Sequence, residues 1–461
     1  PYMEPRILYR TSNFSVLAAV GIGFSALMLR ATTFATLLDG NPPDQFFLEG
    51  VDGYLAIYFF SYVQAILVVF VAGDFRKAEE KARLDQVMLS RPMTTANWVL
   101  GKYFGIVSAL LYLNLFLLLV ATIGRAVKVI ATGVGFDLAP FLTYFAIATL
   151  PSLLFMTAFV FFLVSLFRVQ SVAMIFSLAF VAALWAYFHH DFYGLFDYGA
   201  FFAPLFASDL IGLGDIGDIV QQRLFYTFLG FGLLSFSIVL YPRLKQSTFS
   251  QIVVNLSGAA FLALAAILCF SIISENRARE SKLHADLAAQ ARWIEAPTAQ
   301  VEHYDFDIDS SQPERPLRVQ LDMRLRNPHT HALDSLVFAL NEDFRIAEVR
   351  TANGASIDFV QQNQLLIFNL RTAPLQPGAT QSLSVRYAGR LQNGGESFLL
   401  DRLQKMRGML YREEGPWIMG TMAGHTGAEY VVLPAEVVWY AVPGATAGYA
   451  VEQPRGKKFA T

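Results

Sequence analysis

The feature that most constrains this chain is a series of long apolar runs between residues 14 and 273. A helix needs about 20 apolar residues to cross the hydrocarbon core of a bilayer, and lipid offers no partner for an exposed backbone. Runs of this length therefore predict a polytopic α-helical membrane domain. We expect about seven spans, at residues 14–37, 54–72, 99–123, 141–167, 172–188, 224–241 and 252–273.

Residues 274–461 carry charges, prolines and alternating apolar and polar residues, a composition that predicts a water-soluble part. We therefore expect a transmembrane domain over residues 1–273, a helical stalk over 274–300 and an extracytoplasmic antiparallel β-sandwich over 301–461. The net charge of −2 does not suggest a nucleic-acid partner. The single cysteine, Cys269, lies in an apolar run, which excludes a disulfide framework. The first apolar run is too long for a cleavable signal peptide and lacks a small-residue cleavage site.

The connection between the second and third spans, residues 73–105, is the most basic of the inter-span segments. Short loops rich in Lys and Arg stay on the cytoplasmic side of the membrane, so we place it there. Its spacing predicts an amphipathic helix that Pro92 ends. Thr94 or Thr95 can cap the next helix, whose interfacial Trp98 and Lys102 lead into the bilayer.

This segment resembles the cytoplasmic loop of ABC transporter permeases of the type-2 exporter class. The residues that match are Glu79, Glu80, Asp85, Leu89, Ser90, Arg91, Pro92, Gly101 and Lys102. The resemblance implies that the helix contacts a separate ATPase subunit and transmits its movement. The ATPase-coupling residues it assigns are Arg76, Glu79, Glu80, Arg83, Asp85, Arg91 and Pro92. The alternative is a solvated amphipathic loop with no partner.

The other connections agree with this topology. Residues 39–52 are acidic and read as outside, Arg125 and Lys128 mark a short outer connection, and Arg168 marks a tight inner turn. Residues 189–222 are aromatic and carry several Asp, which predicts short helices at the outer interface; the type-2 exporter family has short extracellular helices at this place. An odd number of spans puts the C-terminal part on the extracytoplasmic side, which in a bacterium is the periplasmic side of the inner membrane.

Few polar residues lie within the predicted spans. The amides of Gln64, Asn114 and Asn255 are either functional or form hydrogen bonds between helices. The fourth span contains Pro151, which membrane helices tolerate where neighbours satisfy the freed carbonyl.

After residue 300 the hydrophobic period changes from 3.6 to 2, which predicts strands. Asn353-Gly354 is a hairpin-type turn, and Pro377-Gly378 is a second turn. This region resembles the N-terminal β-domain of zinc aminopeptidases of the aminopeptidase N type. The phrases that match are residues 304–307, 336–341, 374–378 and 387–389, and residues 429–443 continue them.

The sequence lacks the His-Glu-x-x-His motif of such peptidases and their Gly-Ala-Met-Glu-Asn motif. His303, His329 and His331 read as surface or structural residues, and Asn327-Pro328 suggests a turn before the last two. We expect no catalytic residue, metal site or cofactor on this chain.

The sequence also lacks the phosphate-binding Gly-x-x-x-x-Gly-Lys-(Ser/Thr) motif, so ATP and Mg would bind on a partner ATPase. The function we expect is the permease subunit of an ATP-driven ABC exporter. It would work with an ABC ATPase, a second permease subunit (identical or related) and membrane lipid. The alternative is a membrane-anchored, peptidase-like binding or scaffold protein without transport activity.

Overall fold

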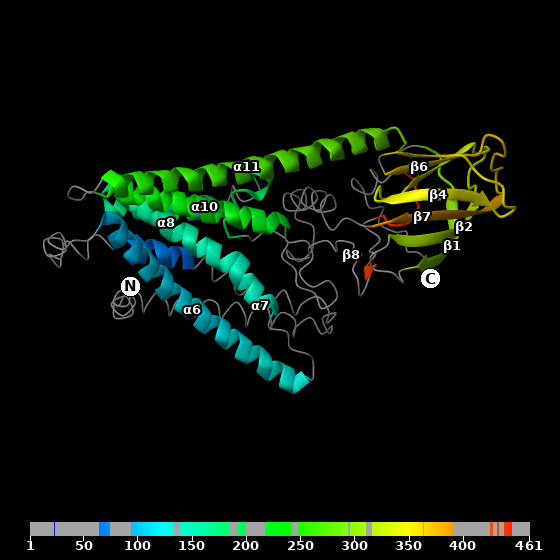
Figure 1. Ribbon diagram of the computed structural model, residues 1–461. Coiled ribbons are helices and arrows are strands. Elements are labelled where there is room, and N and C mark those ends of the chain that lie inside the picture. Colours follow the sequence, from blue (N-terminus) through cyan, green and yellow to red (C-terminus); the bar gives the residue numbers. More distant parts are fainter. Residues whose placement is uncertain are drawn as a thin grey trace. The chain divides into compact units, whose positions relative to one another are not determined.

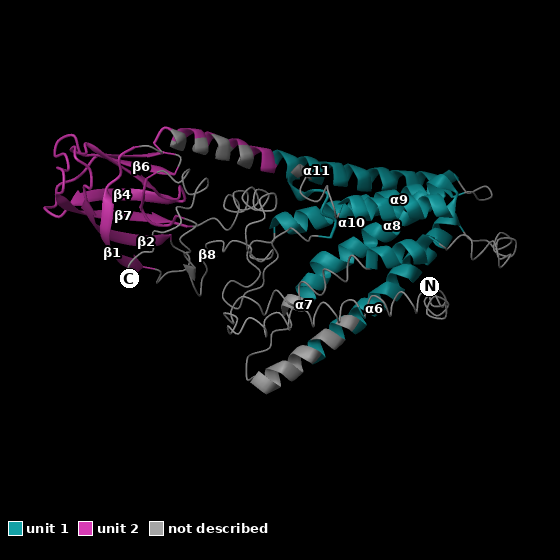
Figure 2. Cartoon of the chain, turned by 180° about the vertical axis from the view of Figure 1, so that it is seen from behind, with its two compact units in different colours: residues 1–274 teal, residues 275–461 magenta. Residues whose placement is uncertain are grey.

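The computed structural model divides into two compact units, Pro1–Ser274 and Glu275–Thr461 (Figure 2). The residues it describes are 23, 64–73, 94–132, 139–184, 191–199, 217–241, 248–293, 296–309, 316–362, 364–390, 425–426, 431–432 and 438–444.

The first unit is helical (Figure 1). It contains a helix over Gln64–Gly73, α6 (Thr95–Thr132), α7 (Ala139–Tyr144), the π-helical turn η1 (Phe145–Thr149), α8 (Leu150–Phe167), α9 (Gln170–Ala183), the 3-10 turn η3 (Asp191–Gly194) and α10 (Gly217–Leu240). The last helix, α11 (Thr248–Ala291), begins in this unit and ends in the second.

Several of these helices have the length and apolar composition of membrane-spanning helices. In the part of the chain that the structure describes, four helices are long and apolar enough to cross it: Thr95–Phe116, Leu142–Phe167, Gly217–Leu240 and Thr248–Ala278. Gln64–Gly73 and Gln170–Ala183 are shorter apolar helices. The expectation of a membrane protein with several apolar helices is confirmed, and the count of seven spans stays a prediction.

Two helices extend beyond the spans predicted from the sequence. Helix α6 continues to Thr132, so Arg125 and Lys128 lie in a helix and not in a connection. No proline follows in this stretch to stop the helix, and its apolar residues continue through Ile130. Helix α11 continues without a break from the last predicted span to Ala291, which agrees with the helical stalk predicted there.

The proline of the fourth predicted span explains a local irregularity. Pro151 lies in the first turn of α8, directly after the π-helical turn η1. A proline inside an α-helix lacks an N–H donor and collides with the carbonyl four residues earlier. The wider π turn relieves that collision, so the helical path from Ala139 to Phe167 continues past the proline.

Glycines let the helices of this unit approach closely. A Cβ at Gly230 of α10 would lie 3.1 Å from the Phe155 Cα of α8. A Cβ at Gly258 of α11 would lie 2.8 Å from the Ser235 Cβ of α10. Small residues at such contacts are typical of helix packing in membranes, where van der Waals contact replaces the hydrophobic effect.

The second unit is a pair of antiparallel sheets, β1-β2-β7-β4 and β10-β3-β6-β5 (Figure 1). The strands are β1 (Gln300–Asp309), β2 (Leu317–Arg326), β3 (Ser335–Ala339), β4 (Phe344–Thr351), β5 (Phe359–Gln362), β6 (Leu365–Asn369), β7 (Thr380–Gly389) and β10 (Val442–Pro443), with β8 (His425–Thr426) paired to β9 (Val431–Val432) apart from them.

Both four-stranded sheets contribute to one hydrophobic core, as in a β-sandwich. The alternation read from the sequence has a direct counterpart in β2, where every second residue from Leu317 to Leu325 is buried. The predicted strands in this unit are confirmed. The sequence could predict them because period-2 patterning decides which face of a strand is buried.

The predicted turns are present as well. Gly354 has φ +80°, and its N–H donates to the Thr351 carbonyl at 2.9 Å. The Asn327 side chain accepts from the His329 N–H at 2.9 Å and donates to the Leu375 carbonyl at 2.8 Å, which makes a turn at this point. The later segment joins the unit through β10, which pairs with β3.

Candidate functional site

The N-terminal end of α6 is organised by its cap and by three side chains. Thr94 Oγ1 accepts a hydrogen bond from the Asn97 N–H at 3.1 Å, so Thr94 is the capping residue of the two that the sequence offered. Lys102 is only 6% exposed, and its Nζ lies 4.5 Å from the centroid of the Trp98 ring. That ring is 4.6 Å from the ring of Tyr241, which follows α10.

This packing adds to the expectation for Trp98 and Lys102, whose place at the membrane interface stays a prediction. Both are buried in the helical unit, and the ammonium lies against an aromatic face, a contact that strengthens when water is excluded. The start of α6 is therefore linked to the end of α10.

The predicted ATPase-coupling residues lie outside the described part of the chain. They are Arg76, Glu79, Glu80, Arg83, Asp85, Arg91 and Pro92. The helices on either side are described, and both contribute to one core. Ala65, Val68 and Ala72 of the first helix are buried with Tyr103 and Leu110 of α6. The segment that contains the predicted residues thus joins, on both sides, helices that pack in the same core.

The structure contains a polar cluster around residues 191–199 that was not predicted from the sequence. We call it the Arg223 cluster; it consists of Ser152, Asp197, Tyr198, Gln222, Arg223 and Tyr226. All six are buried. Arg223 Nη2 donates to the Asp197 carbonyl at 2.6 Å, and Nη1 donates to the Tyr198 carbonyl and, at 3.3 Å, to Ser152 Oγ.

The remaining bonds of the cluster also end on backbone carbonyls. Ser152 Oγ donates to the Tyr198 carbonyl at 2.8 Å, and Tyr226 donates to the Leu195 carbonyl at 2.5 Å. Gln222 Nε2 donates to the carbonyls of Gly194 and, at 3.2 Å, Asp197. Buried carbonyls outside regular structure need donors, and one face of α10 supplies them.

The described part of residues 189–222, residues 191–199, begins with the short helical turn η3 and is folded into the helical unit. Its predicted place at the outer interface stays a prediction. Helix α10 begins at Gly217, seven residues before the predicted span at Leu224, so Arg223 lies inside a helix. An arginine next to an apolar run was the available signal, but its role depends on carbonyls that are distant in the sequence.

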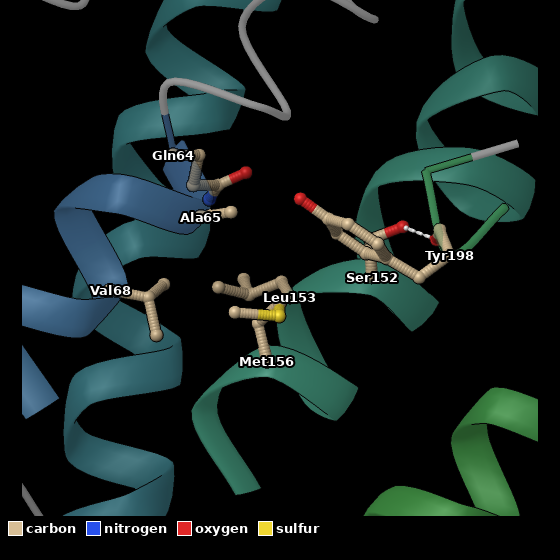
Figure 3. Close-up of a pocket in the computed structure, with 7 residues that line it drawn as sticks. All are labelled: Gln64, Ala65, Val68, Ser152, Leu153, Met156 and Tyr198. Atoms are coloured by element: carbon tan, nitrogen blue, oxygen red, sulfur yellow. Dashed lines mark hydrogen bonds between the residues drawn. The ribbon is translucent and has the colours of Figure 1, made fainter. Parts of the chain in front are cut away.

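The three amides named from the sequence have different surroundings. Gln64 is 2% exposed and lines a cavity of about 10 Å³ (Figure 3). Asn114 Nδ2 donates to the Leu110 carbonyl of its own helix at 2.7 Å, and Asn255 is exposed. Of the three amides, Gln64 alone lines this cavity, with Ser152 and Tyr198 on the other side of it.

The histidines of the second unit have structural contacts. His329 Nε2 lies 3.0 Å from the Thr298 carbonyl oxygen, and the rings of His329 and His331 are 5.4 Å apart. Within the described ranges, no group of three or more His, Cys, Asp or Glu side chains is arranged to hold a metal ion.

Comparison with known families identifies the class of the helical unit. Residues 47–208 match the family described as "ABC-2 family transporter protein". The chain therefore contains an ABC-2 family transporter membrane domain, and the matched range includes the predicted coupling segment and the described residues 191–199. No curated protein matches the chain.

Among solved structures, the chain is similar in part to M1 zinc metallopeptidases. One from Deinococcus radiodurans is 26% identical with a TM-score of 0.19, over 21% of this chain and 22% of that one. A mutant two-domain M1 zinc metallopeptidase bound to L-arginine is 19% identical with a TM-score of 0.21, over 32% of this chain and 30% of that one. The chain thus spans less than a third of the length of these peptidases.

Proposed function

We propose that this chain is a permease subunit of an ATP-driven ABC exporter. The observation that carries the proposal is the ABC-2 family match over residues 47–208, which includes the basic segment between the second and third predicted spans. Permeases of this family generally work with an ATPase partner. ATP and Mg would bind on that subunit, since this sequence has no phosphate-binding loop of its own.

The proposed mechanism passes through Asp74–Arg91. ATP binding brings two ATPases together and displaces this segment. It is continuous in the chain with the helix Gln64–Gly73 and with α6. Both helices pack in one core, so a displacement of the segment moves packed helices and not free ends. A second permease subunit, identical or related, would enclose the pathway with this one.

We place the β-sheet unit on the extracytoplasmic side of a bacterial inner membrane. The support is the distribution of basic residues in the sequence, with the richest connection at residues 73–105. In this arrangement the second unit serves as a docking surface or as the base of further extracytoplasmic domains, and the stalk over 274–300 connects it to the last span.

The test is charge reversal in the predicted coupling helix. The triple variant Glu79→Lys, Glu80→Lys, Arg83→Glu should lose the co-purifying ATPase or uncouple its hydrolysis, because complementary charges at a contact become repulsive. Affinity purification of the full chain with its ATPase, followed by an ATPase assay, measures both.

A matched control has the same change in net charge at exposed positions of the β-sheet unit. Asp305→Lys, Asp307→Lys, Arg318→Glu meets that condition, and all three positions are exposed on β1 and β2. It should leave ATPase recovery unchanged. Equal recovery and equal activity in the two triple variants would exclude the coupling role. Failure of any ATPase to co-purify with the unaltered chain would favour the membrane-anchored scaffold.

A further inference from the structure

The starting observation is a buried amide inside the helical unit. Gln64 is 2% exposed, and its Nε2 has no hydrogen-bond partner among the residues that the structure describes. A buried amide without a partner is unfavourable, so the group requires either a neighbour or a bound molecule.

The cavity beside Gln64 fits one small polar molecule. Its volume is about 10 Å³, which is roughly what a single water needs. The Gln64 side chain and the Tyr198 hydroxyl point toward each other across it (Figure 3). A water there would have the amide and the hydroxyl as partners. The other lining side chains are Ala65, Val68, Ser152, Leu153 and Met156, four of them apolar.

The far side of the cavity is already part of a hydrogen-bonded network. The Tyr198 carbonyl accepts from Ser152 Oγ at 2.8 Å and from Arg223 Nη1. A link from Gln64 to the Tyr198 hydroxyl would therefore connect the helix Gln64–Gly73 to α8 and α10 through one residue of the 191–199 segment.

We propose that this cavity binds one water molecule that bridges the Gln64 amide and the Tyr198 hydroxyl, and that the bridge couples the helix Gln64–Gly73 to the 191–199 segment. The coupling part rests on the proposed function, since this helix leads directly into Asp74–Arg91. A water bridge suits a moving contact, because its hydrogen bonds nearly equal direct ones and re-form after a shift.

The first test is a double-mutant cycle on thermal unfolding of the full chain in detergent. Gln64→Leu and Tyr198→Phe should each lower the unfolding midpoint, and the double variant should lie no lower than the worse single variant, because either change removes the same bridge. Asn114→Leu is the matched control. Its amide bonds its own helix, so its effect should add to that of Tyr198→Phe. Additive effects for Gln64 and Tyr198 would overturn the bridge.

The second test is a high-resolution structure of the unaltered complex. One water between Gln64 and Tyr198, lost in Tyr198→Phe, is the expected result. A direct contact between the two side chains, or a dry cavity, would overturn the proposal.

The third test concerns coupling. Gln64→Leu should keep the ATPase bound but lower its hydrolysis rate by several-fold. An unchanged rate, or loss of the ATPase itself, would overturn the coupling role. If no ATPase co-purifies with the unaltered chain, the proposed function fails, while the unfolding cycle still decides the water bridge.

Discussion

Arg168 is the residue on which the turn between α8 and α9 depends. It has φ 58° and ψ −2°, the left-handed region, and its N–H donates to the Val164 carbonyl at 3.1 Å. This closes α8, and only Val169 separates Arg168 from α9. A residue with a Cβ is disfavoured there by about 1–2 kcal/mol, so this conformation is maintained by the packing of the two helices.

Substitutions at Arg168 should separate backbone strain from side-chain loss. Arg168→Gly should leave stability unchanged within about 1 kcal/mol, because relief of strain offsets the greater freedom of glycine when unfolded. Arg168→Val should lower stability by about 1–3 kcal/mol, since a β-branched residue tolerates positive φ poorly. Thermal unfolding in detergent measures both. Equal midpoints for the two variants would mean that the left-handed conformation is not maintained in the native state.

At the scale of elements, α8 and α10 form the most extensive contact between the described helices of the first unit. It combines the Arg223 cluster with a close approach at Gly230 and an edge-on contact of Phe155 with Tyr226, whose ring centroids are 4.8 Å apart. A polar network and a small-residue contact on the same pair of helices fix both their register and their separation.

Gly230→Ala should therefore destabilise the protein by about 1–3 kcal/mol, because the added Cβ meets backbone that cannot move aside. Gly101→Ala in α6 is the matched control. Nothing lies within 4 Å of a Cβ there, so alanine should be neutral or stabilising by up to about 1 kcal/mol. Unfolding midpoints of the two variants and the unaltered chain decide this. A Gly230 variant as stable as the Gly101 variant would contradict the packing.

The whole molecule combines a membrane unit with a β-sheet unit, and its sidedness is the property to test at this scale. In a Cys269→Ala background, Ser356→Cys, at an exposed position between β4 and β5, should react with a membrane-impermeant maleimide in intact spheroplasts. Ser90→Cys, in the predicted inner segment, should react only after permeabilisation. The physical reason is the retention of basic loops in the cytoplasm. The opposite labelling pattern would reverse the topology.

The sequence by itself determined the features that depend on neighbours along the chain. Apolar runs long enough to cross a bilayer gave the membrane class, and period-2 alternation gave the strands and their buried face. Turn and cap chemistry gave the turns at Asn327 and Gly354 and limited the cap of α6 to Thr94 or Thr95, of which the structure selects Thr94. These predictions succeeded because backbone conformation, capping and amphipathicity are local properties. The coupling residues, from Arg76 to Pro92, stay a prediction.

Only the tertiary structure decided which polar groups are buried together. Arg223 finds carbonyls of residues 197 and 198, Lys102 lies on Trp98, and Gln64 faces Tyr198. In the sequence each looks like a charge or an amide at the edge of, or within, an apolar run. Their roles depend on which groups from distant segments surround them, because a buried polar group must find its partner in space. Local patterning carries no information on that partner.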